Sequence, residues 1–211
     1  MKITRIAKKD ENNVAIYLDN DEVLFLTYEV FLKNGLRKNV EIPADHFDFL
    51  IRENQKYHIK KKAFSLIARR LHSASEIRMK LRQKKYDKEL VEEVINDLSA
   101  NKYIDDKKFA DEFADEKIRL KLWGKSKIKN ELMKRGIDLQ IISDVLDEKF
   151  QEGNDINNAV ELAEKKFNTL RGRNLEEIKL KQKLYAFLSA RGYDYETSKD
   201  AVDKIIGESK E

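Results

Sequence analysis

The heptapeptide LRQKKYD at residues 81–87 returns twice more along the chain, as LMKRGID at residues 132–138 and as LSARGYD at residues 188–194. Apolar positions recur with it, because Ile77 and Leu81 have apolar equivalents in the second and third copies. Self-similarity of this kind is the signature of a repeat architecture. The sequence therefore predicts three tandem units of similar structure.

Each unit has the pattern of three short helices. In the first unit, Ala63, Ile67 and Leu71 follow the i, i+4 spacing of a buried helix face. Ser73 begins a Ser-x-x-Glu capping box and so predicts the start of a second helix. Asp87 is a favourable N-cap for a third helix. The apolar stripe of that helix consists of Leu90, Val91, Val94, Ile95 and Leu98.

The turn between the second and third helices also recurs. Asp138 and Asp194 occupy the same N-cap position in the second and third units. Gly136 and Gly192 stand where the preceding helix must end, since glycine adopts the left-handed conformation at little cost. Lys85 replaces this glycine in the first unit, so we expect the first turn to differ from the other two.

The N-terminal part of the chain has a different pattern. Residues 14–28 form two β-rich runs around a polar turn, which predicts a hairpin, and residues 2–7 supply a third strand. Residues 29–35 predict a short helix ended by a glycine. Pro43 predicts the start of a further helix that runs toward the first repeat unit.

The sequence thus predicts a mainly α-helical protein, in which three tandem three-helix repeat units form an elongated array behind a small β-containing N-terminal subdomain. The predicted boundaries are 1–58 for the subdomain, 59–105 for the first unit, 106–152 for the second and 153–211 for the third. Since neighbouring units complete each other's cores in such an array, we expect a monomer.

Composition excludes several classes of protein. The chain contains no cysteine, which rules out a disulfide framework and a thiolate metal site. The pair Asp105–Asp106 is explained as an N-cap followed by a first-turn carboxylate, without a metal. No Walker phosphate loop and no His-Glu-x-x-His motif occur. We therefore expect neither an enzyme nor a bound cofactor. Without a signal peptide or a membrane span, we expect a cytoplasmic protein.

Basic residues gather in blocks that follow the repeats. The net charge is +9 in residues 60–85, +7 in residues 117–135 and +6 in residues 165–191, whereas residues 87–106 carry −5. We expect the second helices to form a cationic strip, with the acidic third helices on another side. Such a strip suits phosphates or the acidic surface of a protein. The candidate binding residues are Arg69, Arg70, Arg78, Arg82, Lys84, Lys85, Lys121, Lys125, Lys127, Lys129, Lys134, Arg135, Lys181, Lys183 and Arg191.

Simpler structural roles compete with binding at several of these positions. Lys84, Arg135 and Arg191 lie in the last turn of their helices, where a cation stabilises the helix dipole by about 0.3–1 kcal/mol without a ligand. The other cations form either the strip or an ordinary solvated face. Trp123 either packs at a helix corner, the usual role of a large aromatic, or stacks on a nucleobase. We also expect Tyr103 to pack at a junction between units.

Two stretches, NKYIDDKKFADEF at residues 101–113 and LWGKSKIKNELMKRGI at residues 122–137, resemble the RecX family of bacterial recombinase regulators. The stretch at residues 68–87 is similar to the family's first unit, and the N-terminal extension is similar to that of Firmicute-type members. The resemblance covers about residues 60–206. The matching motif positions are Tyr103, Asp105, Asp106, Phe109, Ala110, Phe113, Trp123, Gly124, Ile128, Leu132, Gly136 and Ile137.

The resemblance implies a regulator that binds the filament formed by the RecA recombinase on single-stranded DNA. Such a protein lies in the groove of the filament and inhibits ATP hydrolysis, strand exchange and co-protease activity, which modulates recombination, DNA repair and the SOS response. Two alternatives remain open. One is a protein that acts mainly by occupying single- or double-stranded DNA through its basic strip. The other is a helical scaffold that docks another partner through its acidic faces.

Overall fold

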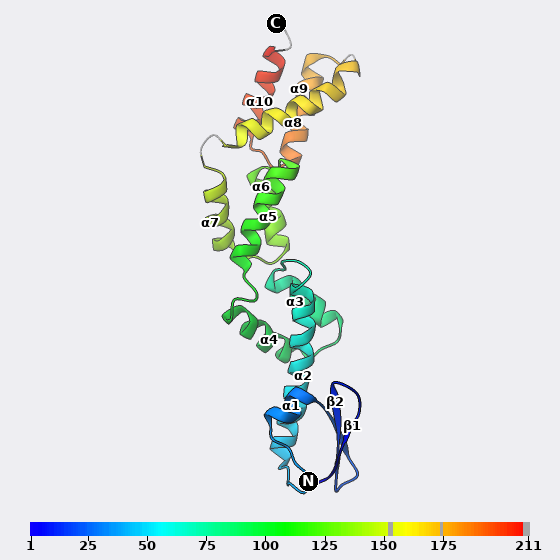
Figure 1. Ribbon diagram of the computed structural model, residues 1–211. Coiled ribbons are helices and arrows are strands. Elements are labelled where there is room, and N and C mark those ends of the chain that lie inside the picture. Colours follow the sequence, from blue (N-terminus) through cyan, green and yellow to red (C-terminus); the bar gives the residue numbers. More distant parts are fainter. Residues whose placement is uncertain (152–153, 174, 209–211) are drawn as a thin grey trace. The chain divides into compact units, whose positions relative to one another are not determined.

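The structure is a computed structural model that describes residues 1–151, 154–173 and 175–208. It divides into two compact units, Met1–Ile104 and Asp105–Glu211 (Figure 1). The first unit contains a small sheet and the first three-helix repeat, and the second unit contains the other two repeats. The mainly helical fold with an N-terminal β-element agrees with the sequence prediction.

The sheet consists of three antiparallel strands in the order β1 (Ile3–Lys8), β2 (Asn13–Leu18) and β3 (Val23–Thr27). This confirms the predicted hairpin and its third strand. Ile16 and Leu26 are fully buried on the inner face, where they contribute to the core of this subdomain. The alternation of buried and exposed residues along β3 is that of a sheet with one face in solvent.

Two helices follow the sheet. The short helix α1 (Tyr28–Lys33) begins where the Thr27 hydroxyl accepts a hydrogen bond from the backbone N–H of Val30. It ends before Gly35, whose φ of +58° lies in the left-handed region that favours glycine. The predicted short helix and its glycine stop are therefore confirmed.

The helix α2 (Ala44–Ile67) starts directly after Pro43, as predicted, and continues for 24 residues. The predicted boundary between residues 58 and 59 lies inside this helix. Leu50 packs into the core of the sheet subdomain, whereas Ile59 packs into the core of the first repeat. One helix is thus shared by both hydrophobic cores of the first unit.

The first repeat is completed by α3 (Ala74–Gln83) and α4 (Lys88–Ala100). The predicted caps are present, because the Ser73 hydroxyl accepts from the N–H of Glu76 and the Asp87 carboxylate accepts from two N–H groups at the start of α4. Leu71 lies in the loop before Ser73, so its predicted place on the preceding helix is wrong. That helix already ends at Ile67.

Lys85 departs from the expectation in a second way. Its φ is +60°, close to the +70° of Gly136 at the same position of the second repeat. The prediction that the first turn would differ is therefore wrong. The chain keeps the same turn and places a lysine in a conformation that side chains other than glycine rarely adopt.

The second repeat consists of α5 (Asp106–Lys121), α6 (Lys125–Lys134) and α7 (Leu139–Lys149). Asp105 and Asp138 cap α5 and α7 with their carboxylates, as predicted. These caps place the start of each helix at a fixed point of the sequence repeat.

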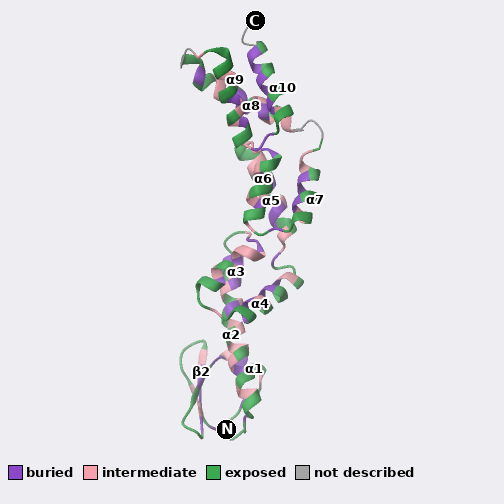
Figure 2. Ribbon diagram, turned by 180° about the vertical axis from the view of Figure 1, so that it is seen from behind, coloured by how far each residue is buried: buried purple, intermediate pink, exposed green. Residues whose placement is uncertain are grey.

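The third repeat consists of α8 (Asn154–Leu170), a 3-10 turn η1 (Arg171–Arg173), α9 (Glu177–Ala190) and α10 (Tyr195–Glu208). The predicted boundary between residues 152 and 153 lies outside the described residues. Within each repeat the buried residues follow one side of the helices, and green exposed residues follow the other (Figure 2). The described helices are therefore amphipathic, and their outer faces are available for contacts.

Candidate functional site

The cationic residues of the first repeat lie on the outer face of α3. Arg78 donates two hydrogen bonds to the Glu92 carboxylate of α4, at 2.8 and 2.9 Å, and Arg82 donates another at 2.8 Å. The acidic third helix thus meets the cationic second helix here, so the expectation that the acidic helices face another side is wrong for this pair. Sequence reasoning missed Glu92, because the contact depends on how α3 and α4 pack.

Other cations of this repeat differ in their freedom. Arg70 pairs with Glu76 at 3.0 Å and also donates to a backbone carbonyl. Arg69, Lys84 and Lys85 are exposed, and their side chains make no hydrogen bond or ion pair with the described residues. These three cations are therefore free to meet an anionic partner.

The second repeat neutralises part of its own charge. Lys125 pairs with Asp147 of α7 at 2.8 Å. Lys134 and Arg135 both pair with Glu131, at 2.9 and 2.8 Å, and these hydrogen bonds lower the pKa of Glu131 to about 2. Among the predicted strip residues of α5 and α6, Lys121 and Lys129 are exposed and have no side-chain partner in the described part of the chain.

The cations of the third repeat have mixed roles. Lys181 pairs with Glu177 at 3.3 Å and lies 3.9 Å from Asp203. Lys183 is exposed, with no side-chain partner among the residues that the structure describes. Arg191 forms the C-cap of α9 and lies over the ring of Phe187.

Lys84, Arg135 and Arg191 occupy the same C-cap position of α3, α6 and α9. Each therefore stands where a cation stabilises the helix dipole. This structural role accounts for their recurrence without a ligand.

Two glycines join the second and third repeats within the second unit. The N–H of Gly124 donates to the carbonyl of Arg191 at 2.8 Å, and the N–H of Ser126 donates to the carbonyl of Gly192 at 3.1 Å. A Cβ atom on Gly124 would lie 2.6 Å from the backbone of Gly192, which is closer than real Cβ contacts. The carbonyls at the end of α9 thus satisfy donors at the start of α6, which has no side-chain cap.

Side chains strengthen this joint. Lys127 donates to the carbonyl of Ala190 at 3.0 Å, and Arg191 donates to the carbonyl of Lys121 at 3.3 Å. Tyr193 is buried and donates its hydroxyl to the carbonyl of Leu122 at 3.0 Å. Two of the predicted binding cations, Lys127 and Arg191, therefore act in part as structural donors.

Trp123 is half-buried beside this joint. Its ring meets Phe113 edge-on, and Lys127 lies 4.8 Å from the ring centroid. Packing is the main role of Trp123, but the residue is less buried than a core aromatic. Truncation would therefore remove less stability than the roughly 3–5 kcal/mol of a fully buried ring.

The remaining motif residues have structural positions. Phe109 is buried in α5, and Asp105 caps that helix. Tyr103 is 54% exposed and meets Phe64 of its own repeat edge-on, so its packing is partial and lies within one repeat. Gly136 occupies the left-handed position at the end of α6.

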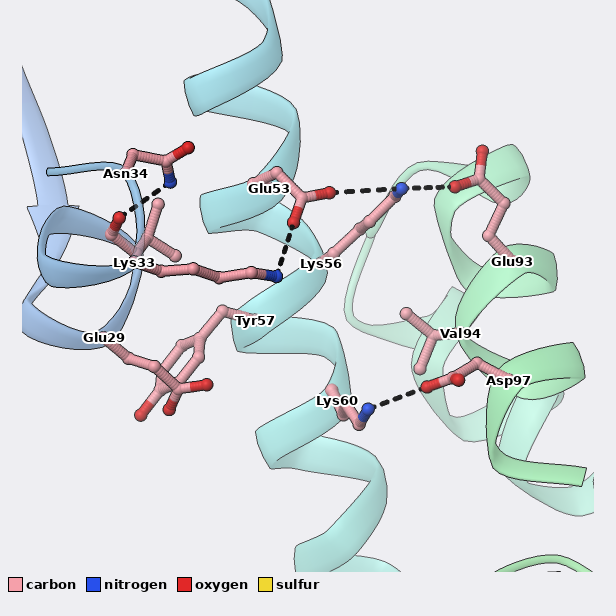
Figure 3. A pocket seen from close by; sticks show the side chains of 11 residues that line it. Glu29, Lys33, Asn34, Glu53, Lys56, Tyr57, Lys60, Glu93, Val94 and Asp97 are labelled. Carbon is pink, nitrogen blue, oxygen red and sulfur yellow. Dashed lines mark hydrogen bonds and ion pairs between the residues drawn. The ribbon is translucent and has the colours of Figure 1, made fainter. Parts of the chain in front are cut away.

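A groove of about 390 Å³ lies between α1, α2 and α4 in the first unit (Figure 3). Lys33, Lys56 and Lys60 line it, and each is paired with a carboxylate across or along the groove. The hydrogen bond to Glu93, at 2.7 Å, raises the pKa of Lys56. This lining is charge-compensated, so the groove serves chiefly to tie the N-terminal subdomain to the first repeat.

Other site classes find no support in the described residues. No group of three or more histidine and carboxylate side chains converges there as a metal site would require. None of the described helices combines the length and apolarity that crossing a membrane requires.

Comparison with known proteins connects this architecture to a family. Models of the first, second and third three-helix domains of RecX match residues 60–98, 105–146 and 154–202. The chain belongs to the RecX family. The regulatory protein RecX of Clostridium acetobutylicum is 32% identical over 98% of this chain and 97% of its own length. That of Clostridium botulinum is 32% identical over 97% and 96%.

Solved RecX structures agree with this assignment. A crystal structure of a regulatory protein RecX is 25% identical, with a TM-score of 0.80 over 96% of this chain and 98% of its own. RecX from Lactobacillus salivarius is 24% identical, with a TM-score of 0.65 over 72% of this chain, and shows the same fold. The RecX fold therefore extends over nearly the whole chain, including its N-terminal subdomain.

Proposed function

We propose that this protein binds the filament that the RecA recombinase forms on single-stranded DNA and inhibits its ATP hydrolysis, strand exchange and co-protease activity. The observation that carries the proposal is the match of all three repeats to the RecX domains, in a chain that aligns with its relatives nearly end to end. Because those relatives are named regulatory proteins, the proposed action is regulation of recombination, DNA repair and the SOS response, without catalysis.

The free cations support this role. Arg69, Lys84 and Lys85 of the first unit, with Lys121 and Lys129 of the second, are exposed and unpaired among the described residues. Exposed cations speed encounter with DNA phosphates or with an acidic protein surface through long-range attraction. A filament of recombinase on DNA presents both kinds of surface.

The test is ATP hydrolysis by the cognate RecA on single-stranded DNA that has been saturated with RecA beforehand. We expect inhibition when this protein is present well below the concentration of RecA, because binding to the filament does not require masking the DNA. Absence of inhibition at every ratio would contradict the proposal and favour the scaffold alternative.

A second candidate function is direct binding of single- or double-stranded DNA, which the same free cations favour. A protein that neutralises six to ten phosphates loses roughly 10³–10⁵ in affinity between about 50 and 200 mM salt. A filament binder retains more affinity, since its contacts with protein persist. Inhibition that appears only when the protein approaches the concentration of DNA sites, and that salt abolishes, would establish this second function instead.

A further inference from the structure

The outer face formed by the second helix and the start of the third changes character from repeat to repeat. Three sets of equivalent positions define it: Arg78, Lys129 and Tyr185; Arg82, Met133 and Ser189; and Lys88, Leu139 and Tyr195. The face is fully cationic in the first repeat, mixed in the second and uncharged in the third. One architecture therefore presents two different chemistries at its two ends of the sequence.

In the third repeat this face carries exposed apolar side chains. The rings of Tyr185 on α9 and Tyr195 on α10 stack at 6.1 Å with an angle of 20° between their planes. Tyr195 is 73% exposed. Ile178 is 72% exposed and precedes Tyr185 by seven residues, which is about two helical turns, so both lie on the same side of α9. These three residues, Ile178, Tyr185 and Tyr195, are called the tyrosine face below.

Carboxylates border the tyrosine face. Lys181 lies between Ile178 and Tyr185 along α9, and its charge is already compensated by Glu177 and Asp203. Burial raises the pKa of Tyr185, and the negative charge of Asp203 raises it further. A DNA phosphate at this face would meet these carboxylates and no free cation of the face itself.

The first repeat offers the opposite environment. Arg78 and Arg82 flank Glu92, and together with Lys88 they leave an excess of positive charge. Phosphates are favoured there by charge. Solvated tyrosine and isoleucine side chains are instead typical of the anchors of protein–protein interfaces, where tyrosine is enriched among the residues that dominate binding.

Packing does not explain the tyrosine face. Single exposed apolar residues are common on protein surfaces. Here, however, two residues that are more than 70% exposed flank a stacked tyrosine on one helix face. Their exposure leaves most of their apolar area to be covered by a partner.

We propose that Ile178, Tyr185 and Tyr195 form a docking surface for the protein component of the filament, in an apolar depression of a recombinase subunit. DNA phosphates are then met by the cations of the first repeat. This assignment rests on the proposed function and divides its two kinds of contact between different repeats.

The test compares two binding measurements for the double variant Ile178→Ser with Tyr195→Ser. The first is inhibition of ATP hydrolysis by preformed RecA filaments, and the second is fluorescence anisotropy of a labelled oligo-dT strand without RecA. We expect half-inhibition to require at least about tenfold more of the variant, as loss of interface anchors does. The oligo-dT affinity should stay within about twofold of the wild type, because phosphates are bound elsewhere.

Two controls separate docking from folding. Leu32→Ser removes an equally solvated side chain, 70% exposed, from α1 of the first unit, and should change neither measurement. Tyr195→Phe keeps the stacked ring and should inhibit like the wild type. Circular dichroism at equal concentration would establish that the double variant keeps its helices.

Each contrary outcome is distinct. Equal inhibition by the double variant and the wild type would overturn the docking surface but leave the proposed function standing. Parallel losses of inhibition and oligo-dT binding would make the tyrosine face a nucleobase-stacking site and overturn the protein assignment. A wild-type protein that does not inhibit RecA would overturn the proposed function and this assignment together.

Discussion

At the scale of single residues, the turn after α3 contains a backbone conformation that its side chain disfavours. Lys85 has φ +60°, and the equivalent Gly136 and Gly192 have +70° and +94°. A left-handed conformation costs a residue other than glycine about 1–2 kcal/mol. Lys85→Gly should therefore raise the free energy of unfolding of the first unit by about 1 kcal/mol, after the greater chain entropy of glycine is subtracted.

Urea denaturation followed by circular dichroism measures this change. The reverse variant Gly136→Lys should destabilise the second unit by a similar amount, because it places a side chain in the same conformation. A Lys85→Gly protein that is less stable than the wild type would show that the lysine makes a contact outweighing the backbone cost.

His72 makes the stability of the first unit depend on pH. The residue is only 7% exposed, and its Nδ1 atom lies 2.9 Å from the carbonyl oxygen of Arg70. Burial lowers the pKa of His72 below its ordinary value of 6.5, so the fold favours the neutral ring. The resulting stability is complete above the unfolded-state pKa and is lost as the pH falls through the lower folded-state pKa.

Urea denaturation between about pH 7.5 and 5 tests this dependence, since most carboxylates stay ionised in that range. We expect the midpoint to fall with pH in the wild type and to fall less in His72→Gln, whose side chain does not titrate. Equal slopes for the two proteins would assign the pH dependence to other groups.

At the scale of helices, Glu92 competes with any anion for Arg78 and Arg82. All three side chains are partly exposed, so their ion pairs contribute little to stability, typically about 0–1 kcal/mol in total. Glu92→Gln should therefore leave the melting temperature nearly unchanged. It should strengthen binding of oligo-dT at low salt, because both guanidinium groups become available to phosphates.

The matched control is Glu89→Gln, which removes the same charge from the exposed start of α4, where the Glu89 side chain has no partner in the described chain. Fluorescence anisotropy should show a larger gain for Glu92→Gln than for Glu89→Gln. Equal gains would mean that only net charge matters, and no gain in either would remove this face from DNA binding.

How far the sequence predicts each element depends on the range of the interaction. The caps at Ser73, Asp87 and Asp138 were predictable, because an N-cap needs only a residue and its near neighbours. The pairing of Glu92 with α3 was not, since it depends on the packing of two helices. The length of α2 was also underestimated, because its apolar positions change partners from one core to the other.

At the scale of the whole molecule, the contact of Gly124 with Gly192 makes the second and third repeats one body. The sequence marked both glycines, one as a family motif position and one as a helix stop, but only the structure brings them together. Such close approach of two backbones explains the need for glycine at both positions. The second unit should consequently unfold in one step.

Gly124→Ala tests this coupling. The φ of Gly124 is −79°, which alanine adopts easily, so any loss comes from the clash of the new Cβ with the backbone of Gly192. Forcing an atom into such a contact typically costs about 1–3 kcal/mol. Trp123, the only tryptophan in the sequence, reports on the second repeat by fluorescence during urea denaturation.

We expect two changes in that fluorescence transition. Its midpoint should fall, and its slope with urea should also fall, because the slope scales with the surface exposed and the second repeat would now unfold without the third. Gly172→Ala is the matched control, since a Cβ atom there meets nothing within 4 Å, and it should behave like the wild type. A lower midpoint with an unchanged slope would mean that the two repeats still unfold together and that the clash only weakens them, because a joint that is merely strained lowers stability without reducing the surface exposed in the transition.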